Sequence, residues 1–212
     1  MAPPAHLVAL HLAAETSAWA AAGFTVVGDE VRIGSVRVSL AGAGTGHGVL
    51  GWDLAGPLGG DLDGLPRPGV ETPATGAAPD HPNGIVAIDH TVAFSPDLDR
   101  TVAALEAAGL QLRRRREGQT ARGSARQAFF WIGDVILEVV EHPPQAREAG
   151  DAGAPARFWG LALVASDLDA TVHSANGLIG EARQAIQPGR RIATFTREAA
   201  LGAAIAVMSP HV

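Results

Sequence analysis

Apolar and polar residues alternate from Ile88 to Phe94, which is typical of a β-strand that buries one face. The spacing then becomes helical, and apolar residues fall on one face at Leu98, Val102 and Leu105. Ser95 is a suitable N-cap for this helix, and Gly109 is a suitable residue to end it. The pattern therefore predicts a strand followed by an amphipathic helix.

Three more strands are predicted after this helix, and together they make a βαβββ unit. They span residues 110–116, 125–132 and 135–140. The dipeptide Gly133-Asp134 is a typical turn between the last two strands. Such a unit leaves one sheet face uncovered after its helix packs on the other face, so a second unit is expected beside it.

The same plan returns near the C-terminus, where DLDATV follows DLDRTV at a constant offset of 70 residues. In this register His90 falls opposite Gly160. The second copy predicts a strand over 159–164, a helix that carries Leu168 and Val172, and strands over 183–187, 191–197 and 203–208. The sequence therefore predicts two paired modules with their helix leucines and valines buried against the sheet, and only one of the modules keeps the histidine.

The N-terminal part follows the plan more loosely. It predicts a strand over 7–12, a short helix around Trp19, and strands over 24–27, 31–40 and 49–54. Segments rich in Pro and Gly separate the units. The predicted organisation is a degenerate module over 5–56, a connector over 57–84, a module over 85–141, a linker over 142–155 and a module over 156–210.

Composition narrows the classes of function. The 212 residues include no Cys, which excludes disulfides, thiolate zinc sites and a cysteine nucleophile. The formal net charge of -6 gives no general attraction to nucleic acid or to an anionic membrane. No apolar run approaches the ~18 residues of a membrane span, and the N-terminal segment lacks the basic start of a signal peptide. A cytoplasmic protein is expected.

The segments IDHTVAFSPDLDRTVAALEAAGL and QAFFWIGDVILEVVEHP, with the later DLDATV copy, resemble the vicinal oxygen chelate superfamily. This superfamily includes glyoxalase I, the bleomycin-resistance proteins and the extradiol dioxygenases. The resemblance covers residues 85–210 well and the N-terminal part loosely. It implies an α+β fold in which repeated βαβββ modules form a curved mixed sheet, a half-open barrel, with a small-molecule cavity between the modules.

The resemblance also implies where metal ligands would lie. In metal-using members, the first and last strands of each module supply one ligand apiece, and His90 and Glu138 match these positions. Glu138 is also the candidate catalytic carboxylate, as a ligand or as a base. The last module offers only Gly160 and Ala206 or Val207 at the matching positions. The expected cofactor is therefore none, or a divalent metal such as Mn, Fe, Ni or Zn in a reduced site.

A different pairing of modules would complete a metal site. If the first module paired with the middle one, His6 would fall opposite His90 and Asp53 opposite Glu138. Two histidines and two carboxylates suit a divalent metal. His6 and Asp53 are thus candidate ligands only under this alternative.

Several further residues are candidates for binding a ligand. Arg126 and Arg191 occupy similar positions at the start of the third strand, where they could orient an anion or remain strand-end arginines in water. Gln127 and Trp131 share one strand face, which either lines the cavity or packs on the helix. The run from 113 to 116 favours a solvated edge strand over a phosphate patch, because alternation would divide its arginines between two faces.

Two main functions follow from these residues and from the resemblance. One is a protein that binds a small molecule without a metal, and the other is a metal-dependent lyase, isomerase or dioxygenase that acts on a small oxygenated substrate. A scaffold that has lost its ligand is the third alternative. The expected partner is a small molecule rather than nucleic acid or a membrane, and a homodimer is an open alternative.

Overall fold

The computed structural model describes residues 5–67, 69, 76–120, 123–141 and 153–211. Its sixteen helices and strands fall into three groups along the chain. No helix among these residues is long and apolar enough to cross a membrane. The N-terminal group contains β1 (His6–Leu12), α1 (Thr16–Ala21), β2 (Val26–Val27), β3 (Glu30–Ile33), β4 (Val36–Leu40) and β5 (Val49–Ala55).

The other two groups are the predicted βαβββ modules. The middle module contains β6 (Ile85–Phe94), α2 (Leu98–Ala107), β7 (Gln111–Thr120), β8 (Gly123–Ile132) and β9 (Val135–Glu141). The last module contains β10 (Arg157–Ala165), α3 (Leu168–Ser174), β11 (Arg183–Gln184), β12 (Arg191–Thr194) and β13 (Ala204–Met208). Short 3-10 turns lie at Ala43–Thr45 and Arg197–Ala199.

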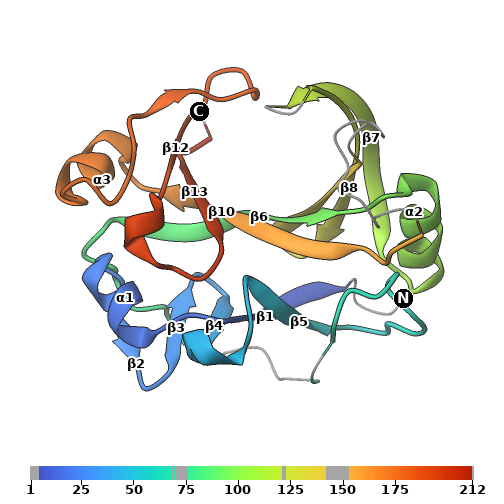
Figure 1. The fold of residues 1–212 in the computed structure, drawn as a ribbon, viewed down its shortest axis with the longest axis horizontal. Coiled ribbons are helices and arrows are strands. Elements are labelled where there is room, and N and C mark those ends of the chain that lie inside the picture. Colours follow the sequence, from blue (N-terminus) through green and yellow to red (C-terminus); the bar gives the residue numbers. More distant parts are fainter. Residues whose placement is uncertain (1–4, 68, 70–75, 121–122, 142–152, 212) are drawn as a thin grey trace.

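The middle and last modules pair through their first strands to form one eight-stranded sheet, in the order β11-β12-β13-β10-β6-β9-β8-β7. His90 lies opposite Ala162, and Val92 lies opposite Gly160, so the offset of 70 residues relates the two halves by a pseudo-twofold axis. Figure 1 shows the sheet bent into a trough, with β12 and β13 rising on one side and β7 and β8 on the other. This is the predicted curved mixed sheet.

The N-terminal strands form a separate five-stranded sheet, in the order β2-β3-β4-β1-β5. The predicted strand over 31–40 is wrong, because Gly34 adopts a left-handed φ of 59° and the chain turns there into two strands, β3 and β4. β4 is therefore the last strand of this βαβββ unit and runs parallel to β1. β5 is an additional strand that pairs antiparallel with β1, as β10 pairs with β6.

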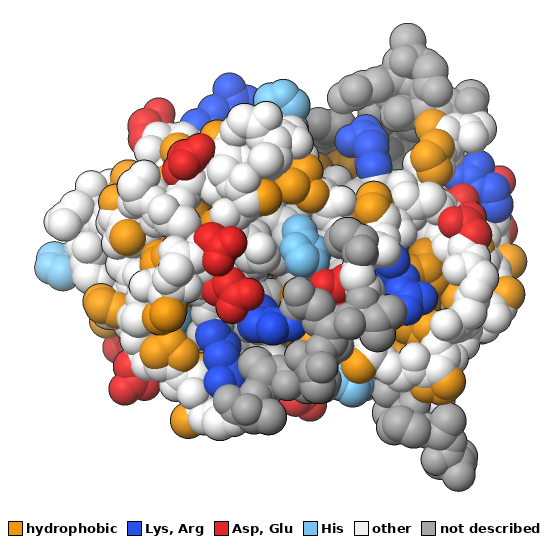
Figure 2. Space-filling model, turned by 90° about the horizontal axis from the view of Figure 1, so that it is seen from below, with side chains coloured by type: hydrophobic (Ala, Val, Ile, Leu, Met, Phe, Trp, Pro, Cys, Tyr) orange, Lys and Arg blue, Asp and Glu red, His pale blue; other side chains and the backbone are white. Residues whose placement is uncertain are grey.

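The five-stranded sheet packs beneath the trough, on the face of the larger sheet that carries the helices (Figure 1). Trp19 and Trp52 are fully buried there, and the ring of Trp52 lies 5.1 Å from the ring of Phe158 on β10. One continuous apolar core thus joins all three modules. Figure 2 shows the lower side of the molecule, where side chains of both charges are mixed with scattered hydrophobic ones.

The helices bury the predicted apolar faces but begin later than predicted. Leu98, Val102 and Leu168 are buried, and Val172 is half-buried against the same core. The N-cap of α2 is Asp97 rather than Ser95, since the Asp97 carboxylate accepts a hydrogen bond from the backbone N–H of Arg100 at 3.0 Å. Asp167 caps α3 in the same way.

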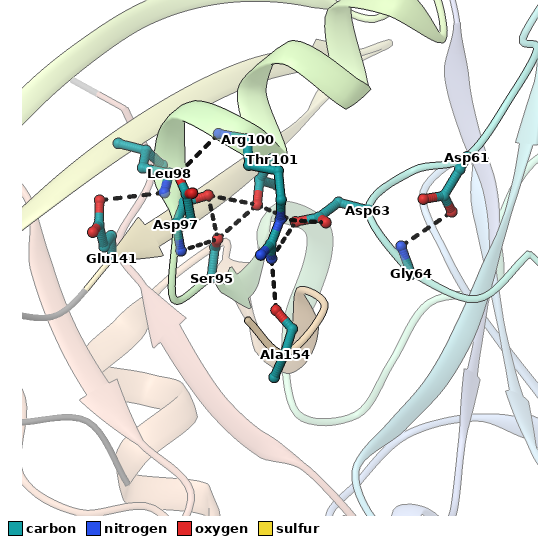
Figure 3. Close-up of polar contacts among 10 residues, drawn as sticks. All are labelled: Asp61, Asp63, Gly64, Ser95, Asp97, Leu98, Arg100, Thr101, Glu141 and Ala154. Carbon is teal, nitrogen blue, oxygen red and sulfur yellow. Dashed lines mark hydrogen bonds and ion pairs between the residues drawn. The ribbon is translucent and has the colours of Figure 1, made fainter. Parts of the chain in front are cut away.

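A buried polar cluster fastens the connector and the end of the linker to α2 (Figure 3). The Asp63 carboxylate accepts two hydrogen bonds from Arg100, at 2.8 and 3.1 Å, and one from the Thr101 hydroxyl. Arg100 also donates to the carbonyl of Ala154 at 2.6 Å. These charge-assisted bonds add to the apolar contacts of the connector, whose Leu62 and Leu65 are buried in the core.

Candidate functional site

A row of polar side chains crosses the inner face of the trough. Alternation along β8 and β9 places Gln127 and Glu138 on this face, while Phe130 and Leu137 point into the core. Each member of the row contacts the next through polar atoms. From the last module to the outer edge of the middle one, the row consists of Arg190, Asp89, His90, Glu138, Gln127 and Arg116.

A β-bulge explains why two consecutive residues join this row. His90 pairs with Ala162 and Ile88 pairs with Leu163, so Asp89 is an extra residue on β6. Such a bulge turns both side chains toward one face, where an unbroken strand would send them to opposite faces. The Asp89 carboxylate consequently lies 2.7 Å from Nδ1 of His90.

This contact fixes the orientation of the histidine. An ionised Asp89 accepts a hydrogen bond, so Nδ1 of His90 carries the proton and Nε2 points toward Glu138. Nε2 and the nearest Glu138 oxygen are 3.7 Å apart, which is too far for a direct hydrogen bond. The histidine nitrogen and the carboxylate oxygen therefore face each other across a short gap. A small movement of either side chain would bring them within hydrogen-bond distance.

Asp89 is held as a carboxylate by groups from two modules. Burial alone would raise its pKa, but hydrogen bonds and charge interactions with His90 and Arg190 outweigh that effect and lower the pKa to about 2. Arg190, of which only 2% is exposed, donates to Asp89 at 2.5 Å and to the carbonyl of Ser209 at 2.8 and 3.0 Å. The nearby His211 Nε2 lies 3.5 Å from the same Asp89 oxygen.

Glu138 is held from its other side by a buried amide. Gln127 donates from Nε2 to Glu138 at 2.5 Å and accepts at Oε1 from Arg116 at 2.9 Å. The absence of a side chain at Gly118 leaves space for this amide, because a Cβ there would lie 3.0 Å from the Gln127 oxygen. The predicted residues Gln127, His90 and Glu138 are thus brought together on one face.

The inner face does not carry a donor set that fits a firmly bound metal. Among the residues that the structure describes, no three His, Asp or Glu side chains are grouped to hold one. Across the pseudo-twofold axis, the positions that match His90 and Glu138 are Gly160 and Ala206, which have no donor atoms. His90 and Glu138 are two protein ligands, fewer than the three or four of established zinc sites.

The alternative set with His6 and Asp53 is wrong, because the middle module pairs with the last one and not with the first. Asp53 lies on the additional strand β5, where its carboxylate contacts Nε2 of His11 at 2.8 Å and the backbone N–H of Gly69 at 2.9 Å. His6 packs at the turn between β8 and β9, beside Gly133. Neither residue reaches the row on the inner face.

Arg126 and Arg191 point to the helix side of the sheet rather than to the inner face. Arg126 donates to Asp99 on α2 at 2.8 Å, and this contact raises the pKa of its guanidinium. Arg191 donates to both carboxylate oxygens of Asp169 on α3, at 2.8 and 2.6 Å. Arg191 begins β12 as predicted, whereas Arg126 is the fourth residue of β8, and each arginine joins its strand to the helix of its own module rather than facing the inner side.

Trp131 lies on the inner face near the outer edge of the sheet and is 42% exposed. The guanidinium of Arg113 stacks over its ring at 4.4 Å. Arg114 and Arg116 stack over the neighbouring Phe129 at 4.8 and 5.5 Å. Three arginines of the run therefore share this face and Arg115 lies on the other, so the predicted division between two faces occurs but is unequal.

A cavity of about 350 Å³ lies away from this row, between the turn at Gly34 and the start of β6. His81 at its wall is engaged on both ring nitrogens, since Nδ1 accepts from the backbone of Thr25 at 3.1 Å and Nε2 donates to the carbonyl of Arg32 at 3.0 Å. Burial lowers the pKa of His81. We therefore assign the histidine a structural role and place the candidate site on the inner face.

Comparison with known proteins finds only distant structural likenesses. No protein-family model matches the chain, and no curated protein is similar in sequence. Among solved structures, the methylmalonyl-CoA epimerase of Mycobacterium tuberculosis has a TM-score of 0.49 and 18% identity, over 61% of this chain and 91% of that one. A Streptomyces coelicolor methylmalonyl-CoA epimerase in complex with 2-nitronate-propionyl-CoA has a TM-score of 0.47 and 20% identity, over 60% and 99%.

A hypothetical protein from Bacillus halodurans C-125 has a TM-score of 0.47 and 15% identity, over 59% of this chain and 94% of that one. At such identities the likeness concerns the fold alone. Two βαβββ modules joined through their first strands are what the sequence resemblance implied. The strand order of the eight-stranded sheet itself shows this arrangement in residues 85–208.

Proposed function

We propose that this protein binds a small molecule on the inner face of its eight-stranded sheet, without a firmly held metal ion. The observation that carries the proposal is the array of Asp89, His90 and Glu138, whose polar atoms meet on that face. The array is partly shielded from water, since the three side chains are 13%, 21% and 15% exposed. It thus offers hydrogen-bond acceptors, Nε2 of His90 and the Glu138 carboxylate, to a ligand on the inner face.

The contrast between the two halves supports a role in binding. The fold needs no polar row, because the equivalent positions of the last module hold Gly160, Ala206 and Ile192. Partly burying ionised groups costs free energy unless hydrogen bonds offset it, and replacing such groups by apolar ones is often neutral for stability. His90, Glu138 and Gln127, which have no polar counterparts in the last module, are therefore better explained by a ligand than by folding.

Catalysis of proton transfer is the second candidate. Asp89 fixes His90 with Nε2 toward Glu138, and a histidine and a carboxylate that lie side by side can both exchange protons with a molecule bound over them. In this role His90 and Glu138 would be the catalytic residues and Asp89 a positioning residue. A metal-dependent lyase, isomerase or dioxygenase would need further ligands in addition to His90 and Glu138.

Ligand screening and elemental analysis test the proposal together. Wild type is screened by thermal shift against small molecules and compared with His90→Ala, Glu138→Gln and, as a matched control far from the row, His6→Ala. We expect ligands that stabilise wild type and His6→Ala but neither of the other variants. Stoichiometric metal in wild type that is lost in His90→Ala would instead establish the metal-dependent alternative.

Sedimentation analysis decides whether the protein is a homodimer.

A further inference from the structure

We propose that the ligand carries an oxyanion group, a carboxylate or a phosphate, which is bound by Arg113, Arg114 and Arg116 of β7. The inference rests on the proposed function, because it assigns a chemical class to the molecule on the inner face. It is carried by the position of these guanidinium groups, by their place over aromatic rings and by the absence of an ion pair between them and any described carboxylate.

A second β-bulge gathers the arginines on one face. Leu112 pairs with Phe130 and Arg114 pairs with Phe129, so Arg113 is an extra residue on β7. The bulge allows Arg113 to reach the inner face over Trp131, next to Arg114. Without it, strict alternation would place only every second arginine there.

The aromatic rings hold the guanidinium groups without neutralising them. The Cζ of Arg113 lies 4.4 Å from the ring centroid of Trp131, and those of Arg114 and Arg116 lie 4.8 and 5.5 Å from that of Phe129. A cation–π contact uses no N–H group, so the terminal NH2 groups of the three arginines can bind the oxygens of an anion, while Nε of Arg116 donates to Gln127. Ordering long side chains in this way also lowers the entropy lost when an anion binds.

The charges of these arginines are not balanced by neighbouring carboxylates. Within the described parts of the chain, Arg113, Arg114 and Arg116 form no ion pair, although the protein has a net charge of -6. Arg115, in the middle of the same run, points to the opposite face and pairs with Asp99 at 2.5 Å. Unpaired positive charge is thus concentrated on the inner face of β7.

The anion would lie directly beside the polar row. Arg116 donates to Gln127, which donates to Glu138, and Phe129 is the cross-strand neighbour of Glu138. A molecule with its oxyanion on β7 would therefore extend along the inner face toward His90. The acidic side chain of Glu138 disfavours a second anionic group at that end.

Arginine at an edge strand can also serve only to discourage strand pairing between molecules. That role requires positive charge on the strand but does not depend on which face carries it. A comparison of arginines on the two faces of β7 therefore distinguishes it from anion binding. Arg113→Gln, Arg114→Gln and Arg116→Gln remove charges on the inner face. Arg115→Gln removes a charge from the same strand on the opposite face and serves as the matched control.

Phenyl phosphate, benzoate and the neutral analogue benzyl alcohol are titrated into each protein by calorimetry at low and high salt. We expect wild type and Arg115→Gln to bind the two anions in preference to the alcohol, more weakly at high salt. Each inner-face substitution should weaken anion binding about tenfold, as expected for one charge-assisted contact. Circular dichroism checks that each variant remains folded.

Equal losses in Arg115→Gln and the inner-face variants, or no preference for the anions, would overturn the inference. Binding of the neutral alcohol that is lost in His90→Ala would then show that the proposed function stands without the anionic ligand class. If neither the anions nor any compound from the thermal-shift screen binds, the proposed function itself fails.

Discussion

Replacing Asp89 by Asn tests how strongly the two modules depend on one buried charge. The substitution keeps the shape of the side chain but removes the negative charge between His90 and Arg190. Because Arg190 is 2% exposed, its positive charge cannot be transferred to water without moving the chain end at Ser209. We expect the folded state to lose stability at neutral pH.

The size of the loss follows from the pKa of Asp89, which is lowered from 3.8 to about 2. At ~1.4 kcal/mol per pKa unit, this shift corresponds to roughly 2 kcal/mol of stability. Since the pKa is lower in the folded state, this contribution is fully present above pH 3.8. It is lost as the pH falls from 3.8 through the folded-state pKa of about 2, and below that pKa the carboxylate is protonated in both states.

Urea unfolding of wild type and Asp89→Asn at several pH values measures the difference. Asp134→Asn, at an exposed turn, is the matched control and should unfold like wild type. The free energy of unfolding of Asp89→Asn should be lower by roughly 2 kcal/mol at pH 7, and the gap should narrow below pH 3.8. A gap under about 0.5 kcal/mol, or one that does not change with pH, would refute the electrostatic account.

Three other substitutions test the fold. Leu98→Ala should cost roughly 2–4 kcal/mol in chemical denaturation, because it leaves a cavity under α2, and a far smaller loss would mean that this face is not packed as described. Gly160→Ala should lower the melting temperature, since a Cβ would lie 2.1 Å from the carbonyl oxygen of Ala204. His81→Gln should flatten the loss of stability below pH 6.5, because burial lowers the pKa of His81 and only the unfolded chain takes up a proton there.

The sequence predicted the paired modules correctly because the relevant signals are local or repeated. Hydrophobic spacing located α2 and α3, and the offset of 70 residues related their strands. Ser95 was a plausible N-cap by residue type. The actual cap, Asp97, lies two residues later, because Ser95 bonds instead to the backbone of Asp97 and to Thr101.

The candidate site could be predicted only in part. His90, Gln127 and Glu138 lie on regular strand positions, so a family resemblance and alternation were enough to find them. Asp89 was missed because a bulge reverses the face that alternation assigns to it. Arg190 was missed because its partner lies 101 residues away in the sequence, and no local pattern signals such a contact.

The histidine that occurs in one copy of the repeat has a steric explanation as well as a chemical one. At Gly160 the strand β10 approaches β13 so closely that a Cβ would lie 2.1 Å from a backbone oxygen. A histidine cannot occupy this position unless the two strands move apart. In the last module, the first and last strands therefore pack too closely at this position for a side chain. In the middle module, the corresponding strands leave space for His90 and Glu138. To engineer a metal ligand at Gly160, one would first have to move β10 and β13 apart. The two modules therefore differ in backbone spacing as well as in side chains.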